Sequence, residues 1–271
     1  MADLRVIVAG AAGRMGRMVL RAMRETEGFV LTGALERANS PWTGQDPGPL
    51  SGGPPTGIVI ATDPLPLLLH ADAIIDFSSP AATVELSALA AQARIAHVIG
   101  TTGLSEEDLD RIEAAAWHAP IVRSGNMSLG VNLLAALTRT AAAALDDSYD
   151  VEIVEMHHRM KVDAPSGTAL MLGAAAAEGR GVSLKTHTAA PREGVTGPRK
   201  RGDIGFASLR GGTVVGEHST IFAGEGERLV LTHHAEDRGV FAYGALKAVA
   251  WAQKKKPGLY SMADVLGLPT A

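Results

Sequence analysis

The sequence has no cysteine, which excludes disulfide bonds, thiolate metal ligands and a cysteine nucleophile. Basic residues form no long run apart from Lys254-Lys255-Lys256, which is typical of a solvated helix end, so no nucleic-acid partner is predicted. No stretch approaches the ~20 apolar residues of a membrane span, and the first residues lack the basic segment and apolar core of a signal peptide. We therefore expect a cytoplasmic protein without a membrane partner.

The bulk composition is that of an ordinary globular protein. The chain has 271 residues, of which 46% are hydrophobic and 20% charged, and its formal net charge is −4. This length predicts one large or two modest domains, enough to bury a real core.

The N-terminal part alternates between strand and helix patterns. An apolar, β-branched strand over residues 4–9 precedes a helical spacing over 14–25 and a second strand over 29–35. Residues 40–57 are rich in Gly, Pro and Ser and predict a loop. Further strands are predicted over 58–60, 73–77, 96–100 and 120–123, and further helices over 80–93 and after Ser105. The alternation predicts an α/β domain with a Rossmann-type doubly wound parallel sheet.

The pattern changes after residue 128. A long helix over 129–145 leads to a strand over 151–156 and a helix over 168–177, and residues 185–203 read as a loop. Three strands with few helices between them follow, over 204–209, 214–222 and 228–234. These predict a second, α+β domain with an open mixed sheet, over residues 129–238. A helix over 240–254 returns to the first domain, which therefore comprises residues 1–128 and 239–271.

A glycine-rich turn links the first strand to the first helix. Gly10, Gly13 and Gly16 give the spacing G-x-x-G-x-x-G. Glycine permits a tight turn and a close approach of pyrophosphate to the backbone, and the helix N-terminus favours anions. The bare pattern would also fit simple strand–helix packing, but its place within a β-α-β unit favours dinucleotide binding.

The second strand ends on two charged residues of opposite sign. Glu36 follows Gly16 by 20 residues, where an acidic side chain can accept hydrogen bonds from the adenosine ribose. Arg37 could pair with the 2′-phosphate of NADP. Glu36 alone favours NADH and Arg37 alone favours NADPH, so the preference stays open and the cofactor is NADPH or NADH.

Two small polar turns follow later strands. Gly100-Thr101-Thr102-Gly103 and Ser124-Gly125-Asn126-Met127-Ser128 come at strand ends. Ligands of open α/β sheets bind beyond the carboxyl ends of strands. Small hydrogen-bonding residues there suit a nicotinamide and its ribose, although each turn alone fits an ordinary polar loop as well.

The segment from His157 to Thr168 concentrates chemistry-bearing residues after a strand. Neighbouring strand residues point to opposite faces, so His157 and His158 are not expected to share a metal ion, and no metal site is predicted. One histidine could donate a proton and the other could hold the substrate or pack. Lys161 could hold a carboxylate or assist the proton. A lone histidine is usually structural, but two histidines and a lysine beside an anion site favour function.

A second candidate anion site lies at a helix start. Ser166-Gly167-Thr168 combines a hydroxyl, backbone amides and the helix dipole. It predicts a small acidic substrate such as a carboxylate.

Five segments resemble the dihydrodipicolinate reductase family, which is also called 4-hydroxy-tetrahydrodipicolinate reductase. They are GAAGRMGR at 10–17, IGTTG at 99–103, GNMSLGVN at 125–132, EMHHRMKVDAPSGTAL at 155–170 and VGEHSTIFAGEGERLVLTHHA at 215–235. The segment from His157 to Thr168 is far more specific than the glycine turn.

The resemblance implies an NAD(P)H-dependent homotetramer of two-domain subunits that reduces a small cyclic dicarboxylate on the diaminopimelate route to lysine. The second domain would then bind substrate and form the oligomer. The resemblance makes His157 the general acid and Lys161 the second catalytic residue. It places the substrate at His158, Gly167 and Thr168, beside Ser166. The cofactor contacts it implies are Gly10, Ala11, Ala12, Gly13, Arg14, Met15, Glu36, Arg37, Gly100, Thr101, Thr102, Ser124, Gly125, Asn126 and Met127.

Two departures from the family pattern and two rival functions accompany the resemblance. Met127 stands where relatives often carry Phe, which affects packing against the nicotinamide, and Met160 replaces a polar residue, which we take as neutral. One rival is another two-domain NAD(P)-dependent dehydrogenase of amino or keto acids. The other is an NADP sensor without chemistry, which would need neither the proton donor nor the substrate anion site.

Overall fold

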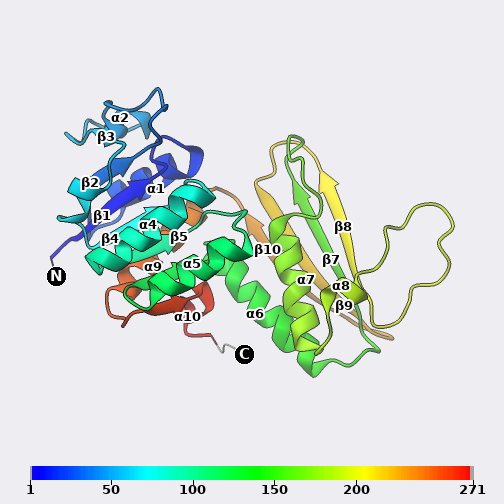
Figure 1. Ribbon diagram of the computed structural model, residues 1–271. Helices are drawn as coiled ribbons and strands as arrows, with labels where there is room; N and C mark the ends of the chain where they lie inside the picture. Colours follow the sequence, from blue (N-terminus) through cyan, green and yellow to red (C-terminus); the bar gives the residue numbers. More distant parts are fainter. Residues whose placement is uncertain (1, 269–271) are drawn as a thin grey trace. The chain divides into compact units, whose positions relative to one another are not determined.

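The computed structural model describes residues 2–268, which divide into two compact units (Figure 1). Unit 1 runs to Leu129 and resumes at Arg238, and unit 2 comprises Gly130–Asp237. Each unit has its own sheet and its own core, and each is described by itself below.

Unit 1 is built on a seven-stranded parallel sheet in the order β11-β6-β5-β4-β1-β2-β3. The strands are β1 (Leu4–Ala9), β2 (Phe29–Leu35), β3 (Ile60–Ala61), β4 (Ala73–Asp76), β5 (Ala96–Ile99), β6 (Pro120–Arg123) and β11 (Gly258–Tyr260). The chain builds outward from β1 to β3 on one side and then from β4 to β11 on the other. The predicted doubly wound sheet is confirmed, and the strand order reverses between β1 and β4.

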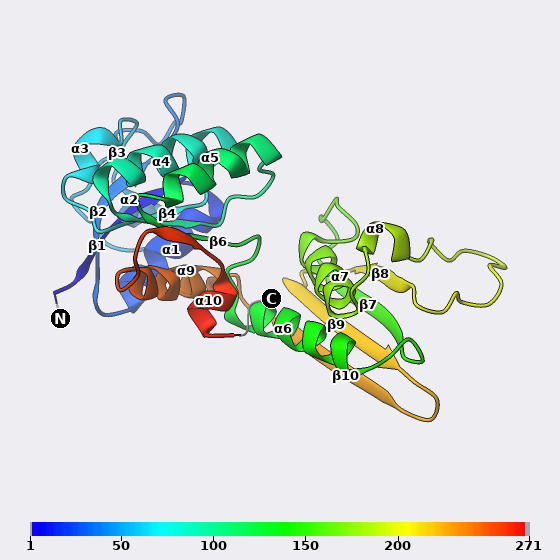
Figure 2. The same cartoon turned by 60° about the horizontal axis from the view of Figure 1, so that its bottom comes forward.

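Helices cover both faces of this sheet (Figure 2). Val6 and Val8 of β1 face one apolar cluster, together with α1 and α9, whereas Ile7 and Ala9 face another, together with α4. This alternation is the period of two expected for a strand buried on both sides. The helices of unit 1 are α1 (Arg14–Glu25), α2 (Pro47–Leu50), α3 (Leu65–Leu68), α4 (Pro80–Ala93), α5 (Glu106–Ala116), α9 (Gly239–Ala252) and α10 (Met262–Leu266).

Local sequence signals account for several of these boundaries. Ser105 and Asp108 form a reciprocal capping box at the start of α5, and Pro80 occupies the first turn of α4. The sequence analysis missed α2, α3, β11 and α10, and it predicted a loop where a short helix, α8 (Leu184–His187), is found, because elements of three to five residues carry too little periodicity to be recognised.

Unit 2 is a four-stranded mixed sheet in the order β10-β9-β7-β8. Its strands are β7 (Asp150–His157), β8 (Ile204–Arg210), β9 (Gly216–Ala223) and β10 (Arg228–Ala235), with β7 and β8 parallel and the other pairs antiparallel. Its helices are α6 (Leu129–Ala144), whose first residue falls in unit 1, α7 (Gly167–Gly179) and α8 (Leu184–His187). Val151, Ile153 and Phe222 pack with Leu134 and Leu172 in one apolar core. The predicted α+β character with an open mixed sheet is confirmed.

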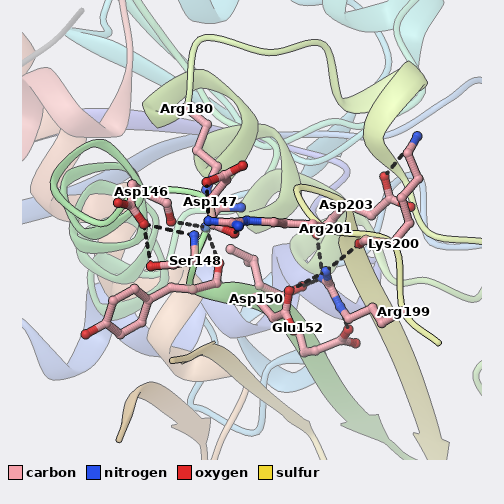
Figure 3. A network of polar contacts seen from close by, with 12 residues as sticks. Asp146, Asp147, Ser148, Asp150, Glu152, Arg180, Arg199, Lys200, Arg201 and Asp203 are labelled. Carbon is pink, nitrogen blue, oxygen red and sulfur yellow. Dashed lines mark hydrogen bonds and ion pairs between the residues drawn. The ribbon is translucent and has the colours of Figure 1, made fainter. Parts of the chain in front are cut away.

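The long connection between α8 and β8 is fastened at the start of β7 (Figure 3). The Arg199 guanidinium donates to Asp150 at 2.7 Å, to Glu152 at 2.9 Å and to the Val151 carbonyl at 3.0 Å. Arg201 pairs with Asp147 at 2.9 Å. This polar network lies at the opposite end of β7 from His157. Its charged residues hold the loop in place and lie apart from the candidate catalytic residues.

Candidate active site

The glycine turn after β1 leaves no room for side chains at two of its glycines. Gly10 has φ +71°, and a Cβ there would lie 2.6 Å from the Phe77 carbonyl oxygen. A Cβ on Gly16 would lie 2.1 Å from the Gly10 carbonyl oxygen. Gly10 therefore lets the chain turn beside the end of β4, and Gly16 lets α1 begin directly against the turn.

The N-terminus of α1 has the features of an anion site. Its N-cap residue Gly13 supplies no side-chain hydrogen bond, and its first turn contains no acidic residue. The first backbone amides of a helix have no intrahelical partner, and the helix dipole places positive charge there. Gly13 is exposed, so a phosphate group can reach this backbone, and the residues fit the pyrophosphate of a dinucleotide.

The acidic end of β2 is tied to this turn. The Ala12 amide donates to Glu36 Oε1 at 3.0 Å, and the amides of Gly10 and Ala11 donate to the Leu35 carbonyl at 3.0 and 3.1 Å. Arg37 follows with an exposed side chain. Glu36 is thus held beside the turn, where it can meet the adenosine end of a bound dinucleotide.

The turns after β4 and β5 are joined by Asp76, a buried carboxylate that the sequence analysis did not single out. Its Oδ1 accepts from the Ser78 amide at 2.9 Å and from the Thr101 hydroxyl at 3.3 Å. Its Oδ2 lies 3.3 Å from Nε2 of the buried His97. Burial opposes ionisation of Asp76, but His97 and Ser78 outweigh it, and the pKa of Asp76 lies below its usual value. Asp76, at the end of β4 beside the strand-order reversal, therefore fixes Thr101 in the turn after β5.

The turn after β6 is held by its own side chains. The Ser124 hydroxyl donates to the Asn126 carbonyl at 2.6 Å, and the Ser128 amide donates to Asn126 Oδ1 at 2.8 Å. Met127 is 1% exposed and belongs to the core of unit 1. The Met127 side chain thus packs inward, and this turn offers a ligand chiefly backbone groups and the exposed Gly125.

In unit 2, the end of β7 carries His157 beside a buried carboxylate. His157 Nδ1 lies 2.5 Å from Glu155 Oε2, and Arg210 of β8 donates to both Glu155 oxygens at 2.9 Å. Glu155 is 1% exposed and His157 is 8% exposed. The two residues share a face because the strand period is two, and parallel pairing sets Arg210 directly opposite His157.

The start of α7 joins the same cluster. The Ser166 amide donates to Glu155 Oε1 at 3.2 Å, and the Ser166 hydroxyl caps the helix by accepting from the Ala169 amide at 3.1 Å. His218 Nε2 lies 3.0 Å from that hydroxyl, and the rings of His157 and His218 meet edge to face at 5.0 Å. The predicted acid and the predicted anion site are therefore brought together on one carboxylate.

The other predicted substrate residues surround this cluster. Lys161 Nζ pairs with Asp163 at 2.8 Å, and the Lys161 amide donates to the His158 carbonyl at 3.1 Å. Gly167 is exposed and a Cβ there would meet open space, whereas Thr168 is half-buried in the first turn of α7. His158 follows the last residue of β7 and is also half-buried.

The surroundings of the cluster shift the pKa values of Glu155, His157 and His218. Burial opposes ionisation of Glu155, but hydrogen bonds from Arg210, Ser208 and His157 outweigh it and bring the pKa of Glu155 to about 2. Burial lowers the pKa of His157, although Glu155 opposes that shift. Burial also lowers the pKa of His218 to about 4. At neutral pH, an ionised Glu155 therefore accepts from His157, and His218 is neutral.

The sequence analysis missed Glu155, Arg210 and His218. Glu155 precedes His157 by two residues, so the strand period alone could have placed both side chains on one face. Arg210 and His218 come from strands more than 50 residues further along the chain, and only the pairing of β7 with β8 and β9 brings them to the site.

Residues 2–268 contain neither a metal-binding cluster nor a membrane-spanning helix. No cluster of three or more His, Asp or Glu side chains is arranged to hold a metal ion within that range. No helix in the same range is long and apolar enough to cross a membrane.

The doubly wound sheet with its glycine turn, joined to a separate acid–base cluster, defines a two-unit dinucleotide-dependent oxidoreductase. Residues 4–127 match the family described as "Dihydrodipicolinate reductase, N-terminus", and residues 130–266 match "Dihydrodipicolinate reductase, C-terminus". The chain belongs to the dihydrodipicolinate reductase family.

Individual relatives agree with this membership. The 4-hydroxy-tetrahydrodipicolinate reductase of Parvibaculum lavamentivorans is 64% identical over 98% of this chain and 99% of its own. The enzyme of the same name from Brucella abortus is 59% identical over 98% and 99%. The solved dipicolinate-bound dihydrodipicolinate reductase of Paenisporosarcina sp. TG-14 has a TM-score of 0.78 and 25% identity, over 97% of this chain and 98% of its own. An amine dehydrogenase from Mycobacterium smegmatis shares the fold, with a TM-score of 0.61 and 15% identity, over 99% and 97%.

Proposed function

We propose that this protein reduces 4-hydroxy-tetrahydrodipicolinate to tetrahydrodipicolinate with NAD(P)H, in the diaminopimelate route to lysine. The two ring compounds differ by replacement of a hydroxyl group with hydrogen, so one hydride and one proton enter and one water leaves. The observation that carries the proposal is the convergence of His157 and the start of α7 on Glu155. It supports the proposal because reduction of a cyclic dicarboxylate needs a proton donor close to a group that binds an anion.

Unit 1 supplies the cofactor site. We assign the pyrophosphate to the backbone from Gly10 to Met15, the adenosine end to Glu36 and Arg37, and the nicotinamide with its ribose to the turns at Gly100–Thr102 and Ser124–Met127. The bound nicotinamide supplies the hydride. Asp76 holds the Thr101 hydroxyl in place for that ligand.

Unit 2 supplies the substrate site and the proton. The amides of Gly167 and Thr168, at the N-terminus of α7, hold one substrate carboxylate beside Ser166. His158 and Lys161 contact the dicarboxylate, and the Lys161 ammonium also offsets its negative charge. His157 donates the proton from Nε2, because Glu155 occupies Nδ1.

The rival functions lack support of this kind. A dehydrogenase acting on another amino or keto acid shares the fold, but it has no need of the segment from His157 to Thr168, and both halves of the chain match one reductase family. An NADP sensor needs no proton donor next to a second anion site.

A coupled assay tests the reaction. Purified protein is mixed with NADPH or NADH, pyruvate, aspartate semialdehyde and the preceding synthase, and the loss of nicotinamide absorbance is followed. We expect oxidation that depends on the synthase. No oxidation from folded, cofactor-bound protein would overturn the assigned substrate and favour another dehydrogenase or the sensor.

Cofactor preference depends on the opposing charges of Glu36 and Arg37. We expect Arg37→Ala to lower kcat/KM for NADPH about 10-fold while leaving NADH use nearly unchanged, because a guanidinium pairs with the 2′-phosphate. Glu36→Ala should act in the opposite sense and raise the NADPH-to-NADH ratio. Initial rates with each cofactor measure the ratio, and Arg94→Ala, on the exposed end of α4, is the matched control.

We further propose a homotetramer located in the cytoplasm. The face of the four-stranded sheet opposite to α6 and α7 presents apolar side chains, among them Leu209 at 50% and Val230 at 48% exposure, in register with Met156 and Ile221. Exposed apolar patches of this kind favour association, and a second copy offers the same face. Sedimentation velocity of the protein and of Val230→Lys tests the oligomeric state, since the charged variant should sediment as smaller species.

A further inference from the structure

Glu155 is the centre of the polar cluster in unit 2. Its Oε2 accepts from His157 Nδ1 at 2.5 Å and from Arg210 Nη1 at 2.9 Å, and its Oε1 accepts from the Ser166 amide at 3.2 Å and from Arg210 Nη2 at 2.9 Å. With a further hydrogen bond from Ser208, the carboxylate has donors on both oxygens and is closed off from water, with 1% exposure. A buried carboxylate of this kind is stable only because every lone pair has a donor.

We infer that Glu155, clamped by Arg210, is a positioning residue that fixes His157 with Nδ1 protonated and Nε2 as the atom that delivers the catalytic proton. The same carboxylate ties the start of α7 to His157, so the proton donor and the substrate's anion site keep one geometry. This inference rests on the proposed reductase function.

Arg210 is suited to the clamp because of its geometry. Besides its two bonds to Glu155, the guanidinium donates to the Leu209 carbonyl at 2.7 Å and to the Asp163 carbonyl at 2.6 Å. It thereby joins β8 to the loop that carries Lys161. A planar fork with several donors makes these contacts at once, which a lysine ammonium cannot reproduce.

The space around Nε2 agrees with this role. A Cβ on Gly216 of β9 would lie 3.1 Å from His157 Nε2, so the glycine keeps that nitrogen clear of a side chain. His218, also on β9, packs edge to face against His157, and its Nε2 lies within hydrogen-bond distance of the Ser166 hydroxyl. His157 is thus held at Nδ1 by Glu155 and flanked by His218, and Nε2 is the nitrogen left for the substrate.

Four titratable or charged groups face His157. Glu155 on its own strand favours the imidazolium, whereas Lys161 and Arg210 disfavour it, and His218 of β9 lies beside the ring as a neutral base. Removing Glu155 therefore lowers the pKa of His157, and removing Arg210 raises it. An opposite charge within hydrogen-bond distance displaces a neighbouring pKa by about 1–3, which makes the Glu155 change measurable. Arg210 acts on His157 through its charge without a hydrogen bond, so its removal should give a smaller shift of the opposite sign.

The experiment compares Glu155→Gln and Arg210→Gln. The pKa of His157 is measured by NMR titration of the ring, assigned by its loss in His157→Gln, and the pH profile of kcat/KM is measured alongside. The basic limb of the profile reports loss of the proton from the free enzyme's general acid. We expect Glu155→Gln to move both readouts to lower pH and to reduce kcat/KM at pH 7 roughly 10- to 100-fold, as when a residue orienting a histidine is removed. Arg210→Gln should move both to higher pH.

Glu152→Gln is the matched control, because Glu152 lies on the same strand and pairs with Arg199 at the far end of β7. It should move neither readout. Unchanged His157 titration in both test variants would overturn the inference, as would shifts in the same direction. Should Glu155→Gln fail to fold, Glu155→Asp takes its place: it keeps the buried charge but withdraws it from Nδ1, so both readouts should again move to lower pH. The titration needs no substrate, so its result does not depend on the coupled assay. If the coupled assay fails but the two variants shift the pKa of His157 in opposite directions, the reductase assignment is overturned and the positioning role stands.

Discussion

Replacing His157 with Ala is expected to lower kcat about 100- to 10,000-fold, the range that proton transfer by a positioned side chain contributes. The reason is local: His157 stands next to Glu155 and the start of α7, and the described cluster offers no second histidine with a free acidic proton, because His218 has its pKa lowered to about 4. Cofactor affinity should not change, since the predicted cofactor residues all belong to unit 1. Single-turnover rates and a fluorescence titration with NADPH measure the two quantities separately.

His234→Ala is the control for this variant. His234 is exposed on β10 and pairs with Glu217 at 3.4 Å, away from Glu155, so its loss should leave kcat within about twofold. Unchanged turnover in His157→Ala would end the assignment of His157 as general acid. The next residue to test would then be Lys161, whose ammonium lies close enough to His157 to affect its pKa.

The parallel sheet of unit 1 was predictable because its strands are short apolar runs between helical patterns. β1, β2 and β6 lie over the predicted residues, and α1 and α4 have the predicted ends. Parallel order also brings the carboxyl ends of β1, β2 and β5 to one edge, so the glycine turn, Glu36 and Thr101 could be expected on the same side. Asp76 escaped notice because a single acidic residue at the end of a strand resembles any solvated turn, and only its burial reveals the role.

In unit 2, neighbouring residues in the sequence indicate the candidate site, but distant residues set its geometry. The segment from His157 to Thr168 contains both the predicted acid and the predicted anion site, and local sequence was enough to propose them. Their geometry is set by Arg210 and His218, which arrive through β8 and β9 from the far side of a long loop. No pattern within a window of the chain encodes that pairing. Sequence therefore pointed to the candidate reacting groups, whose roles stay predictions, and not to the residues that hold them in place.

Gly16→Ala is expected to destabilise unit 1 by about 1–3 kcal/mol or more and to abolish cofactor binding, as overpacking against a closed neighbour does. The added Cβ would lie 2.1 Å from the Gly10 carbonyl oxygen and 2.7 Å from the Ala11 Cα, and both are backbone atoms that cannot rotate away. The start of α1 must then move off the turn, which removes the anion site. Thermal unfolding and isothermal titration with NADPH measure the two effects.

Gly13→Ala separates cofactor contact from packing in the same turn. A Cβ there would meet one atom, the Gly10 carbonyl oxygen at 3.1 Å, and Gly13 is exposed at the N-cap of α1. The cost in stability should stay below about 1 kcal/mol, the scale of an N-cap change, yet the affinity for NADPH should fall at least ~10-fold because the methyl group stands where the pyrophosphate approaches. Equal cofactor affinity in Gly13→Ala and the unsubstituted protein would mean that the turn packs α1 against β1 without holding the phosphates. The dinucleotide would then have to be bound by the turns after β5 and β6 and by Glu36 and Arg37, and the substitutions at those two charged residues would become the decisive measurement.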